Sequence, residues 1–390
     1  MNSTAKMHII VLTATVIFLL LSTPPLYATW TGIELDLEGA LSRDPYVAGE
    51  TDTSAAWGLT GRYMLQETWS DFLFELHILA GQMGNTSSSS LILFSNSSPF
   101  RVMDLEAVHS RDDRTILFSE VDRLAVTFEG SFVRATLGRQ AITWGEAFFF
   151  NIEDIFGAFP AIETNRLHKQ GIDAVTLNIS TGRFSELAAV GIPADNNPGS
   201  LALRYSFPAG KGNISLVGGE TAGDTLIGGG FAGDFSGTKI YFHSLWTDPD
   251  NERSFTQFVL GAERWVDSVT HILAEVYRNG WGTTDRNDYP ALLLTERFLS
   301  GRVLTLGRWN AAGEISRLFS PLVTGHAALF YNINDGSTLV RVDGGYSLSD
   351  NADLRSGFFL GLGDRKQGSV PRSEYGSVPP SFFGELIVNF

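Results

Sequence analysis

This sequence of 390 residues predicts an all-β fold, a transmembrane antiparallel up-and-down β-barrel of about 18 strands. Three observations point to that fold. The chain opens with an export-type leader, its body alternates between apolar and polar residues, and its last nine residues, FFGELIVNF, alternate up to a terminal aromatic residue. After the leader, no apolar run is long enough for a spanning helix. We therefore expect strands, not helices, to cross a membrane.

The leader has the layout of a secretory signal peptide. One cation, Lys6, precedes an apolar run from Ile9 to Leu21, and two prolines follow before Leu-Tyr-Ala. This order predicts cleavage after Ala28. A membrane anchor helix is the alternative, but the apolar run is short for spanning a bilayer. We expect two parts, a signal peptide at 1–28 and a barrel at 29–390.

The body of the chain alternates with a period of two. In residues 121–130, VDRLAVTFEG, the side chains of Leu124, Val126 and Phe128 fall on one face, and Thr127 falls on the other. Comparable alternation occurs in residues 31–41, 70–81, 268–282 and 338–348. Such segments form strands with one apolar and one polar face.

A soluble β-sandwich and a transmembrane barrel both use such strands, and three features favour the barrel. Many segments reach ten residues, whereas soluble strands average about five to six. The polar faces repeatedly carry full charges, as a wet lumen tolerates. Aromatic residues fall near strand ends, as in interfacial girdles; these are Trp57, Tyr63, Trp246 and Trp281.

The apolar ending fits a barrel because the last strand of a closed barrel must pair with the first. Counting the alternating segments gives 16 to 20 strands, with about 18 favoured by about 20 residues for each strand and its connection. An alternating ending on Phe390 also resembles the assembly signal of bacterial outer-membrane barrel proteins. That resemblance implies that the outer-membrane assembly machinery recognises Phe390.

Composition and motifs exclude several function classes. The 43 Asp and Glu outnumber the 28 Lys and Arg, for a formal net charge of −15. A nucleic-acid partner is therefore not expected, since such binders present a basic face. Residues 228–233, GGGFAG, match Gly-x-Gly-x-x-Gly, but a strand pattern follows them where a cofactor site needs a helix. We expect no enzyme activity, catalytic residue, cofactor or metal site.

Three polar stretches read as exposed connections. Residues 82–99 are Ser-rich and predict an extracellular loop, and residues 247–254 and 278–291 predict further exposed turns. Their composition is typical of turns and loops.

Residues 141–170 break the alternation between a strand ending near Gln140 and one starting near Ile172. So long an irregular connection is usually functional or disordered, and this one is too aromatic for disorder. We expect it to fold into the lumen and narrow it; packing on the outer rim is the alternative. The expected lumen or constriction residues are Arg139, Gln140, Glu146, Glu153, Asp154, Arg166, His168 and Lys169.

Within this segment, aromatic and charged residues have separate expected roles. We expect Phe148, Phe149 and Phe156 to pack against the wall. We expect an acidic rim facing the passage, opposite Arg139 and Arg166. The rim residues would be Glu146, Glu153 and Asp154.

Residues 138–156, GRQAITWGEAFFFNIEDIF, resemble a motif of a group of proteobacterial outer-membrane barrel porins. The matching positions are Gly138, Arg139, Gln140, Trp144, Gly145, Glu146, Asn151 and Asp154. This sequence has Ile152-Glu153 where many of those proteins carry Pro after the Asn. The resemblance implies a channel in the bacterial outer membrane.

The expected function is therefore passive passage of small polar solutes or ions across the outer membrane. The alternative is the barrel sleeve of a porin–cytochrome conduit for transmembrane electron transfer. The expected partners are outer-membrane lipid, the barrel assembly machinery and small polar solutes or ions. The alternative adds a periplasmic multihaem cytochrome.

Overall fold

The computed structural model describes residues 30–43, 53–86, 98–195, 197–250, 252–365 and 370–390. The expected signal peptide, and most of the Ser-rich loop expected at 82–99, lie outside these described residues. Within them, none of the helices is both long and apolar enough to cross a membrane.

The described residues form one antiparallel sheet with 19 strands. The strands are β1 (Trp30–Arg43), β2 (Thr53–Trp69), β3 (Phe72–Asn85), β4 (Glu106–Arg111), β5 (Thr115–Glu129), β6 (Val133–Gln140), β7 (Ile172–Gly182), β8 (Ser185–Ile192), β9 (Ser200–Ala209), β10 (Gly212–Thr221), β11 (Asp224–Phe235), β12 (Thr238–Pro249), β13 (Phe255–Trp265), β14 (Thr270–Asn279), β15 (Trp309–Ser320), β16 (Val323–Asn332), β17 (Thr338–Ser349), β18 (Ala352–Leu362) and β19 (Ser381–Asn389). Three short helical turns, η2 (Arg286–Asp288), α2 (Tyr289–Leu292) and α3 (Glu296–Leu299), lie between β14 and β15.

Eighteen of these strands close into a barrel, and β4 is an addition to the wall. One edge of β5 pairs with β3 along nearly its whole length. The other edge pairs with β4 at residues 116–120 and with β6 at residues 124–129. The strands β4 and β6 therefore share one edge of β5. The short strand β6 covers only one end of that edge, and β4 covers the other end. The predicted closed barrel of about 18 strands is confirmed.

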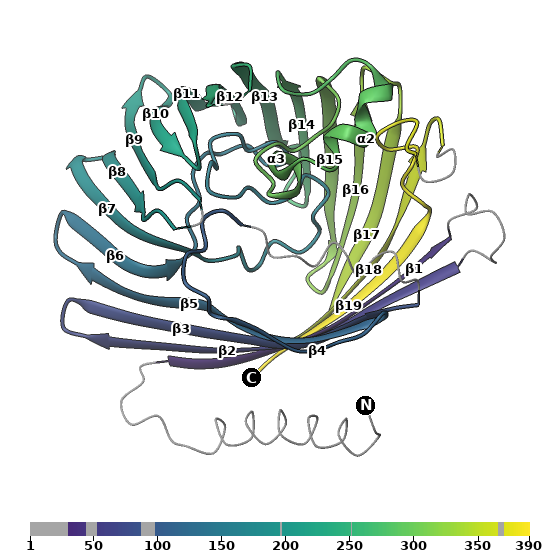
Figure 1. Ribbon diagram of the computed structural model, residues 1–390, viewed down its shortest axis with the longest axis horizontal. Helices are drawn as coiled ribbons and strands as arrows, with labels where there is room; N and C mark the ends of the chain where they lie inside the picture. The colour runs from purple at the N-terminus through teal and green to yellow at the C-terminus, as the bar shows by residue number, and fades with distance from the viewer. Residues whose placement is uncertain (1–29, 44–52, 87–97, 196, 251, 366–369) are drawn as a thin grey trace.

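The barrel closes where the first and last of the described strands meet. Strands β1 and β19 pair in register from Glu34 with Asn389 to Ser42 with Ser381. Beyond β19, the amide of Phe390 donates a hydrogen bond to the carbonyl oxygen of Ile33 at 2.8 Å. Figure 1 shows the purple first strand beside the yellow last strand. The sequence-based expectation that the apolar ending is the closing strand is confirmed.

The two faces of the wall follow the predicted alternation. On β5, Val126 and Phe128 are 44% and 37% exposed, whereas Thr127 is buried and its hydroxyl bonds that of Thr136 on β6. On β2, Leu59 is exposed while Arg62 points inward and is buried. The barrel therefore carries an apolar exterior and a polar interior.

The two rims differ. At one rim the connections between strands have only two to four residues. Large aromatic side chains are highly exposed at this rim; they are Trp69, Phe132, Phe184, Trp265 and Phe319. The expected girdle residues Trp57 and Trp246 are exposed on their strands, but Trp281 lies beyond β14, where its indole nitrogen donates to Glu252. The longer connections, including residues 141–171 and 280–308, all leave the opposite rim.

Candidate functional site

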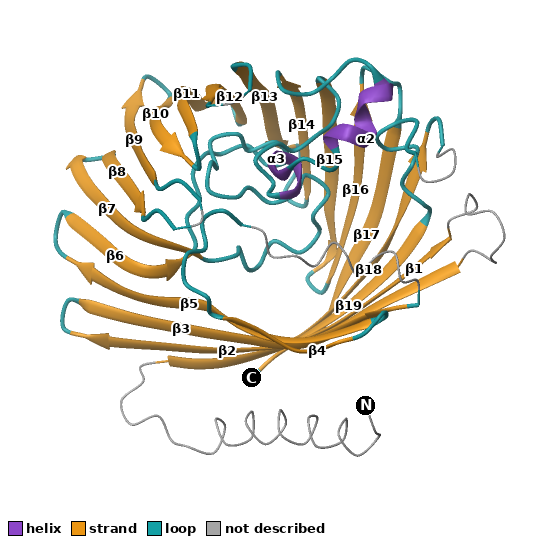
Figure 2. Ribbon diagram, viewed as in Figure 1, coloured by secondary structure: helices purple, strands orange, loops and turns teal. Residues whose placement is uncertain are grey.

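Residues 141–171 form an irregular segment inside the barrel, which we call the lumen segment. It leaves the wall where β6 ends at Gln140 and returns where β7 begins at Ile172. Figure 2 shows it as a teal loop within the ring of orange strands. Its side chains and backbone bond strands from several sides of the barrel, namely β1, β10, β12, β14, β18 and β19.

Aromatic residues attach this segment to the far wall. Phe149 and Phe150 are both fully buried. The ring of Phe150 stacks on Tyr277 of β14 at a centroid distance of 4.8 Å, and Phe149 meets Phe330 of β16 edge to face at 5.0 Å. Phe148 differs from its neighbours, because it is 39% exposed and the guanidinium of Arg166 lies 4.4 Å from its ring centroid.

Near the start of the segment, a second aromatic group packs on the opposite side. The ring of Phe156 is 2% exposed and meets those of Phe100 and Trp144 edge to face, at 5.5 and 5.3 Å. Of the three phenylalanines expected against the wall, Phe149 and Phe156 are buried and Phe148 is half-exposed. Aromatic packing of this kind holds an irregular backbone in one place, since each ring buries a large apolar area.

Glu275 of β14 supplies the strongest polar anchor, and sequence reasoning missed it. Its carboxylate accepts hydrogen bonds from three successive backbone amides, those of residues 148–150, at 2.6, 3.1 and 2.9 Å. It also accepts one from the hydroxyl of Tyr241 on β12 at 2.5 Å. Glu275 is 2% exposed, and charge-assisted bonds of this kind are the strong ones. The alternation did place Glu275 on the polar face of its strand, but no local pattern indicates its partners.

The expected acidic rim is wrong for two of its three members. Glu153 has no exposed surface; it accepts a 2.6 Å hydrogen bond from the Ser215 hydroxyl and lies 2.8 Å from Nδ1 of His243. Asp154 is 5% exposed and lies 2.5 Å from the ammonium of Lys169, while burial raises the pKa of Asp154 to about 6. Glu153 therefore attaches the segment to β10 and β12, while Asp154 joins two parts of the segment to each other, because buried charges must be paired.

The third acid, Glu146, stays partly exposed and lies 3.6 Å from the ammonium of Lys239 on β12. Lys239 also contacts Glu263 at 3.0 Å. Glu146 is therefore part of a solvated ion-pair group and is not brought together with Glu153 and Asp154.

Arg139 and Gln140 belong to the wall and not to a rim. Arg139 is fully buried, and its guanidinium donates to both carboxylate oxygens of Asp173 at 2.7 and 2.9 Å. Strict alternation would place Arg139 on the outer face with Leu137. Gly138 adopts a positive φ of 121°, a backbone conformation that favours glycine, and the inward Arg139 follows it. The expected position of Arg139 opposite an acidic rim is therefore wrong.

The side chain of Gln140 bonds neighbouring backbone. Its amide nitrogen donates to the carbonyl oxygen of Ala174 at 3.0 Å, and its amide oxygen accepts from the hydroxyl of Thr176 at 3.0 Å. Gln140 thus joins β6 to β7 just below the point where the lumen segment begins.

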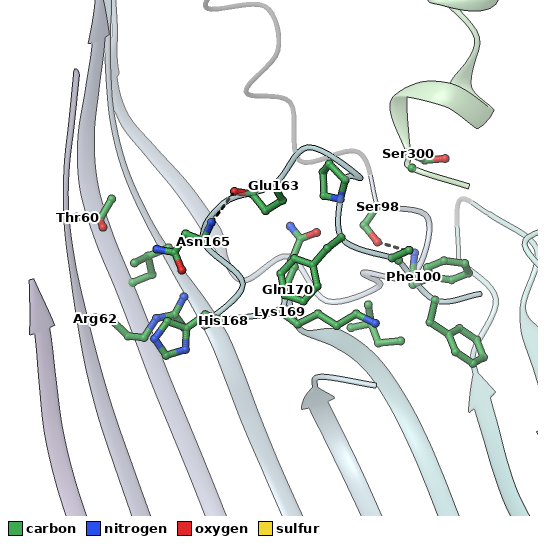
Figure 3. Close-up of a pocket in the computed structure, with 18 of the residues that line it drawn as sticks. Thr60, Arg62, Ser98, Phe100, Glu163, Asn165, His168, Lys169, Gln170 and Ser300 are labelled. Atoms are coloured by element: carbon green, nitrogen blue, oxygen red, sulfur yellow. Dashed lines mark hydrogen bonds between the residues drawn. The ribbon is translucent and has the colours of Figure 1, made fainter. Parts of the chain in front are cut away.

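Two cavities lie between the lumen segment and the wall formed by β1, β2, β3 and β19. The first measures about 490 Å³ and is lined by Asp36, Thr60, Arg62 and His168, among others. Figure 3 shows this cavity, with Thr60 and Arg62 from the wall on one side and Lys169 and Gln170 from the segment on the other. The second cavity measures about 440 Å³ and lies nearer the rim with the long connections.

Four residues line both cavities, and we call them the neck. They are Glu38 of β1, Glu163 and Asn165 of the lumen segment, and Glu385 of β19. The two cavities therefore adjoin at the neck, and we refer to the two together as the passage. Asn165 crosses the neck, since its amide nitrogen donates to Glu385 at 2.6 Å.

The cations that line the first cavity are already paired. Arg62 contacts Asp122 at 2.5 Å, Lys169 contacts Asp154 at 2.5 Å, and His168 lies 3.0 Å from Glu34. In contrast, three acids of the passage take part in none of the ion pairs among the described residues; they are Asp36, Glu38 and Glu163. The unbalanced charge of the passage is therefore negative.

A second segment, residues 280–308, also reaches the interior. Leu299, Ser300 and Gly301 line the first cavity, and Figure 2 shows α3 inside the ring of strands. The exposed turn expected at 278–291 covers only the first part of this segment, where residues 284–288 are exposed, and the inward residues follow it in the chain. Arg297 is 5% exposed and donates two hydrogen bonds to Asp224 of β11, at 2.5 and 2.8 Å.

The other end of this second segment is held by Glu374. The Glu374 carboxylate accepts from the backbone amides of Leu306 and Gly307 at 2.8 and 3.0 Å. Burial raises the pKa of Glu374 to about 7. In the described part of the chain, no group of three or more His, Asp or Glu side chains is arranged to hold a metal ion.

No family model and no curated protein matches the chain. Several solved structures share its fold. OccAB2 of Acinetobacter baumannii is 10% identical, with a TM-score of 0.56 over 94% of this chain and 99% of that one. The outer membrane protein OprD of Pseudomonas aeruginosa is 11% identical, with a TM-score of 0.56 over 95% of each chain. OccAB1 of A. baumannii is 11% identical, with a TM-score of 0.54 over 92% and 96%. At such low identity these likenesses show the barrel fold alone.

Proposed function

We propose that this protein is a bacterial outer-membrane channel for the passive passage of small polar solutes or ions, with a preference for cations. The observation that carries the proposal is the passage along β1. Two adjoining cavities of about 490 and 440 Å³ separate the wall from the lumen segment, and their unbalanced charges are carboxylates. Rings of charge at a narrow point select ions by sign.

The exterior of the barrel supports a place in a membrane. Large apolar side chains are exposed in alternating rows, as at Leu37, Leu59 and Leu260, and a water-soluble protein rarely exposes so continuous an apolar surface. The sheet has no open edge in its ring, which a lipid environment requires. The fold that it shares with the outer membrane protein OprD supports the outer membrane as the location.

The alternative function, as the barrel sleeve of an electron-transfer conduit, gains no support. Such a sleeve needs an interior that admits a multihaem cytochrome. Here the barrel's own lumen segment packs against walls on several sides, with Phe149 and Phe150 fully buried between them. We propose a transport role without catalysis and without a cytochrome partner.

Cation preference provides the test of the proposed function. The double variant Glu38→Gln and Glu163→Gln removes two unpaired charges at the neck. We expect the reversal potential in a KCl gradient across a planar bilayer to fall toward zero, because the negative field at the narrow point is lost. The measurement is single-channel recording on the purified barrel.

Glu186→Gln is the matched control. Glu186 lies on β8, shares a face with the buried Ala188 and Val190, and lines neither cavity. It should leave the reversal potential unchanged. A wild-type barrel that shows no current steps would contradict the channel, and equal shifts in both variants would contradict the assignment to the neck.

The C-terminal residue provides a prediction on assembly. Phe390 is 69% exposed at the seam between β1 and β19, where a recognition factor could reach it. We propose that the barrel assembly machinery recognises it there. Deleting Phe390 should sharply lower the amount of folded, heat-modifiable protein in the outer membrane. Phe390→Tyr retains a terminal aromatic ring and should preserve that amount; unchanged levels after the deletion would remove the role.

A further inference from the structure

The second cavity has an unusual lining for the inside of a wet barrel. Inner faces of channels of this kind are polar. Here Phe359 of β18 and Phe383 of β19 face inward, with ring centroids 5.4 Å apart, and both line the cavity. Met83 of β3 and the half-exposed Ile162 of the lumen segment complete an apolar wall.

Beside this apolar wall lie the carboxylates of the neck. Glu38 is exposed to the passage and belongs to none of the ion pairs among the described residues. The side-chain carboxylate of Glu163 accepts hydrogen bonds from the backbone amides of residues 164 and 165, at 3.1 and 3.3 Å. The cavity thus joins an apolar surface to two carboxylates that belong to none of the ion pairs among the described residues.

A ligand that fits must satisfy both features at once. An apolar group gains by leaving water for the ring faces of Phe359 and Phe383 and the side chain of Met83. A positive group gains from the two carboxylates and from the negative faces of aromatic rings. The volume of about 440 Å³ lies within the range of small-molecule sites, which are mostly apolar with a few convergent polar groups.

We propose that the second cavity binds small organic cations, an ammonium or guanidinium group joined to an apolar chain or ring. The site deepens the proposed channel function, on which it rests, by naming a class of solute. An inorganic cation would leave the apolar wall unused, and a neutral apolar solute would leave the carboxylates unused.

Three probes of graded chemistry test the site: benzylammonium, methylammonium and benzyl alcohol. The first has both groups, the second only the charge and the third only the ring. Binding to the detergent-purified barrel is measured by saturation-transfer difference NMR, and block of the KCl current is measured in planar bilayers. We expect benzylammonium to bind and block at concentrations about tenfold lower than either of the other probes. A difference in affinity of this size is what burying part of one ring can supply.

Variants separate the two features. Glu38→Gln with Glu163→Gln should bring benzylammonium to the level of benzyl alcohol. Phe359→Leu keeps an apolar side chain but removes a ring, and it should weaken benzylammonium more than it weakens methylammonium. The control Glu186→Gln should alter neither probe.

Each contrary result would overturn one part of the proposal. Equal action of benzylammonium and benzyl alcohol on the wild type overturns the role of charge, and equal action of benzylammonium and methylammonium overturns the role of the apolar wall. Binding lost equally in Glu186→Gln overturns the location. A barrel that binds benzylammonium by NMR but never conducts overturns the channel and leaves the binding site in place.

Discussion

Replacing residues 146–163 with a flexible glycine–serine linker is expected to raise the single-channel conductance several-fold while leaving the barrel folded. The replaced residues include Phe149, Phe150 and Phe156, which fill the interior between opposite walls. The 18-strand wall does not depend on them, since every strand pairs with two neighbours through backbone hydrogen bonds. Removing the filling widens the narrowest part of the passage.

The replacement also frees the polar wall residues Glu275 and His243 from the segment. In a wide, wet lumen these groups hydrate, so their loss of partners costs less than it would in a dry core. Conductance is measured in planar bilayers, and folding by heat modifiability on gels. The same linker inserted after Gly210, in the two-residue turn between β9 and β10, is the control and should leave conductance unchanged. An unchanged conductance after the replacement would show that the segment does not narrow the passage.

Arginine on the outer face of the wall should be far more damaging than arginine one residue away on the inner face. Leu59 lies near the middle of β2, is 50% exposed and pairs with Leu37 on β1. Leu59→Arg should lower the free energy of unfolding by about 2–4 kcal/mol if the side chain meets the centre of the bilayer. Thr60 lines the first cavity beside Asp36, so Thr60→Arg places the cation in water near a carboxylate and should cost little.

Equilibrium unfolding in lipid vesicles, followed by tryptophan fluorescence, compares the two variants. The two substituted residues lie on one strand and at nearly the same depth in the membrane. A difference in stability between the variants therefore reports only which face of the wall carries the arginine. A larger loss for Thr60→Arg than for Leu59→Arg would invert the assignment of inner and outer faces. Similar small losses would place β2 outside the hydrocarbon region.

The sequence was informative wherever a property repeats along a strand. Alternation predicted which side of β5 is exposed, at Val126 and Phe128, because successive side chains in a strand must point to opposite faces. The ending at Phe390 predicted closure, since a barrel leaves no edge and the last strand must find the first. The break in alternation after Gln140 also predicted an irregular segment, and its aromatic content predicted burial of Phe149 and Phe156.

The pattern of the sequence predicted the strands, most of their faces and the segment that leaves the wall. Which charges of that segment face water depends on its tertiary contacts. Glu153, Asp154 and Glu163 are all acids of the same irregular segment. Glu153 is buried against Ser215 and His243, and Asp154 is buried against Lys169. Glu163 instead lines the passage. The partners of Glu153 come from β10 and β12, far along the chain, and the partner of Asp154 comes from the far end of the segment itself. Whether a carboxylate is paired and buried or lines a cavity depends on what the closed barrel brings opposite it, and no local pattern contains that information.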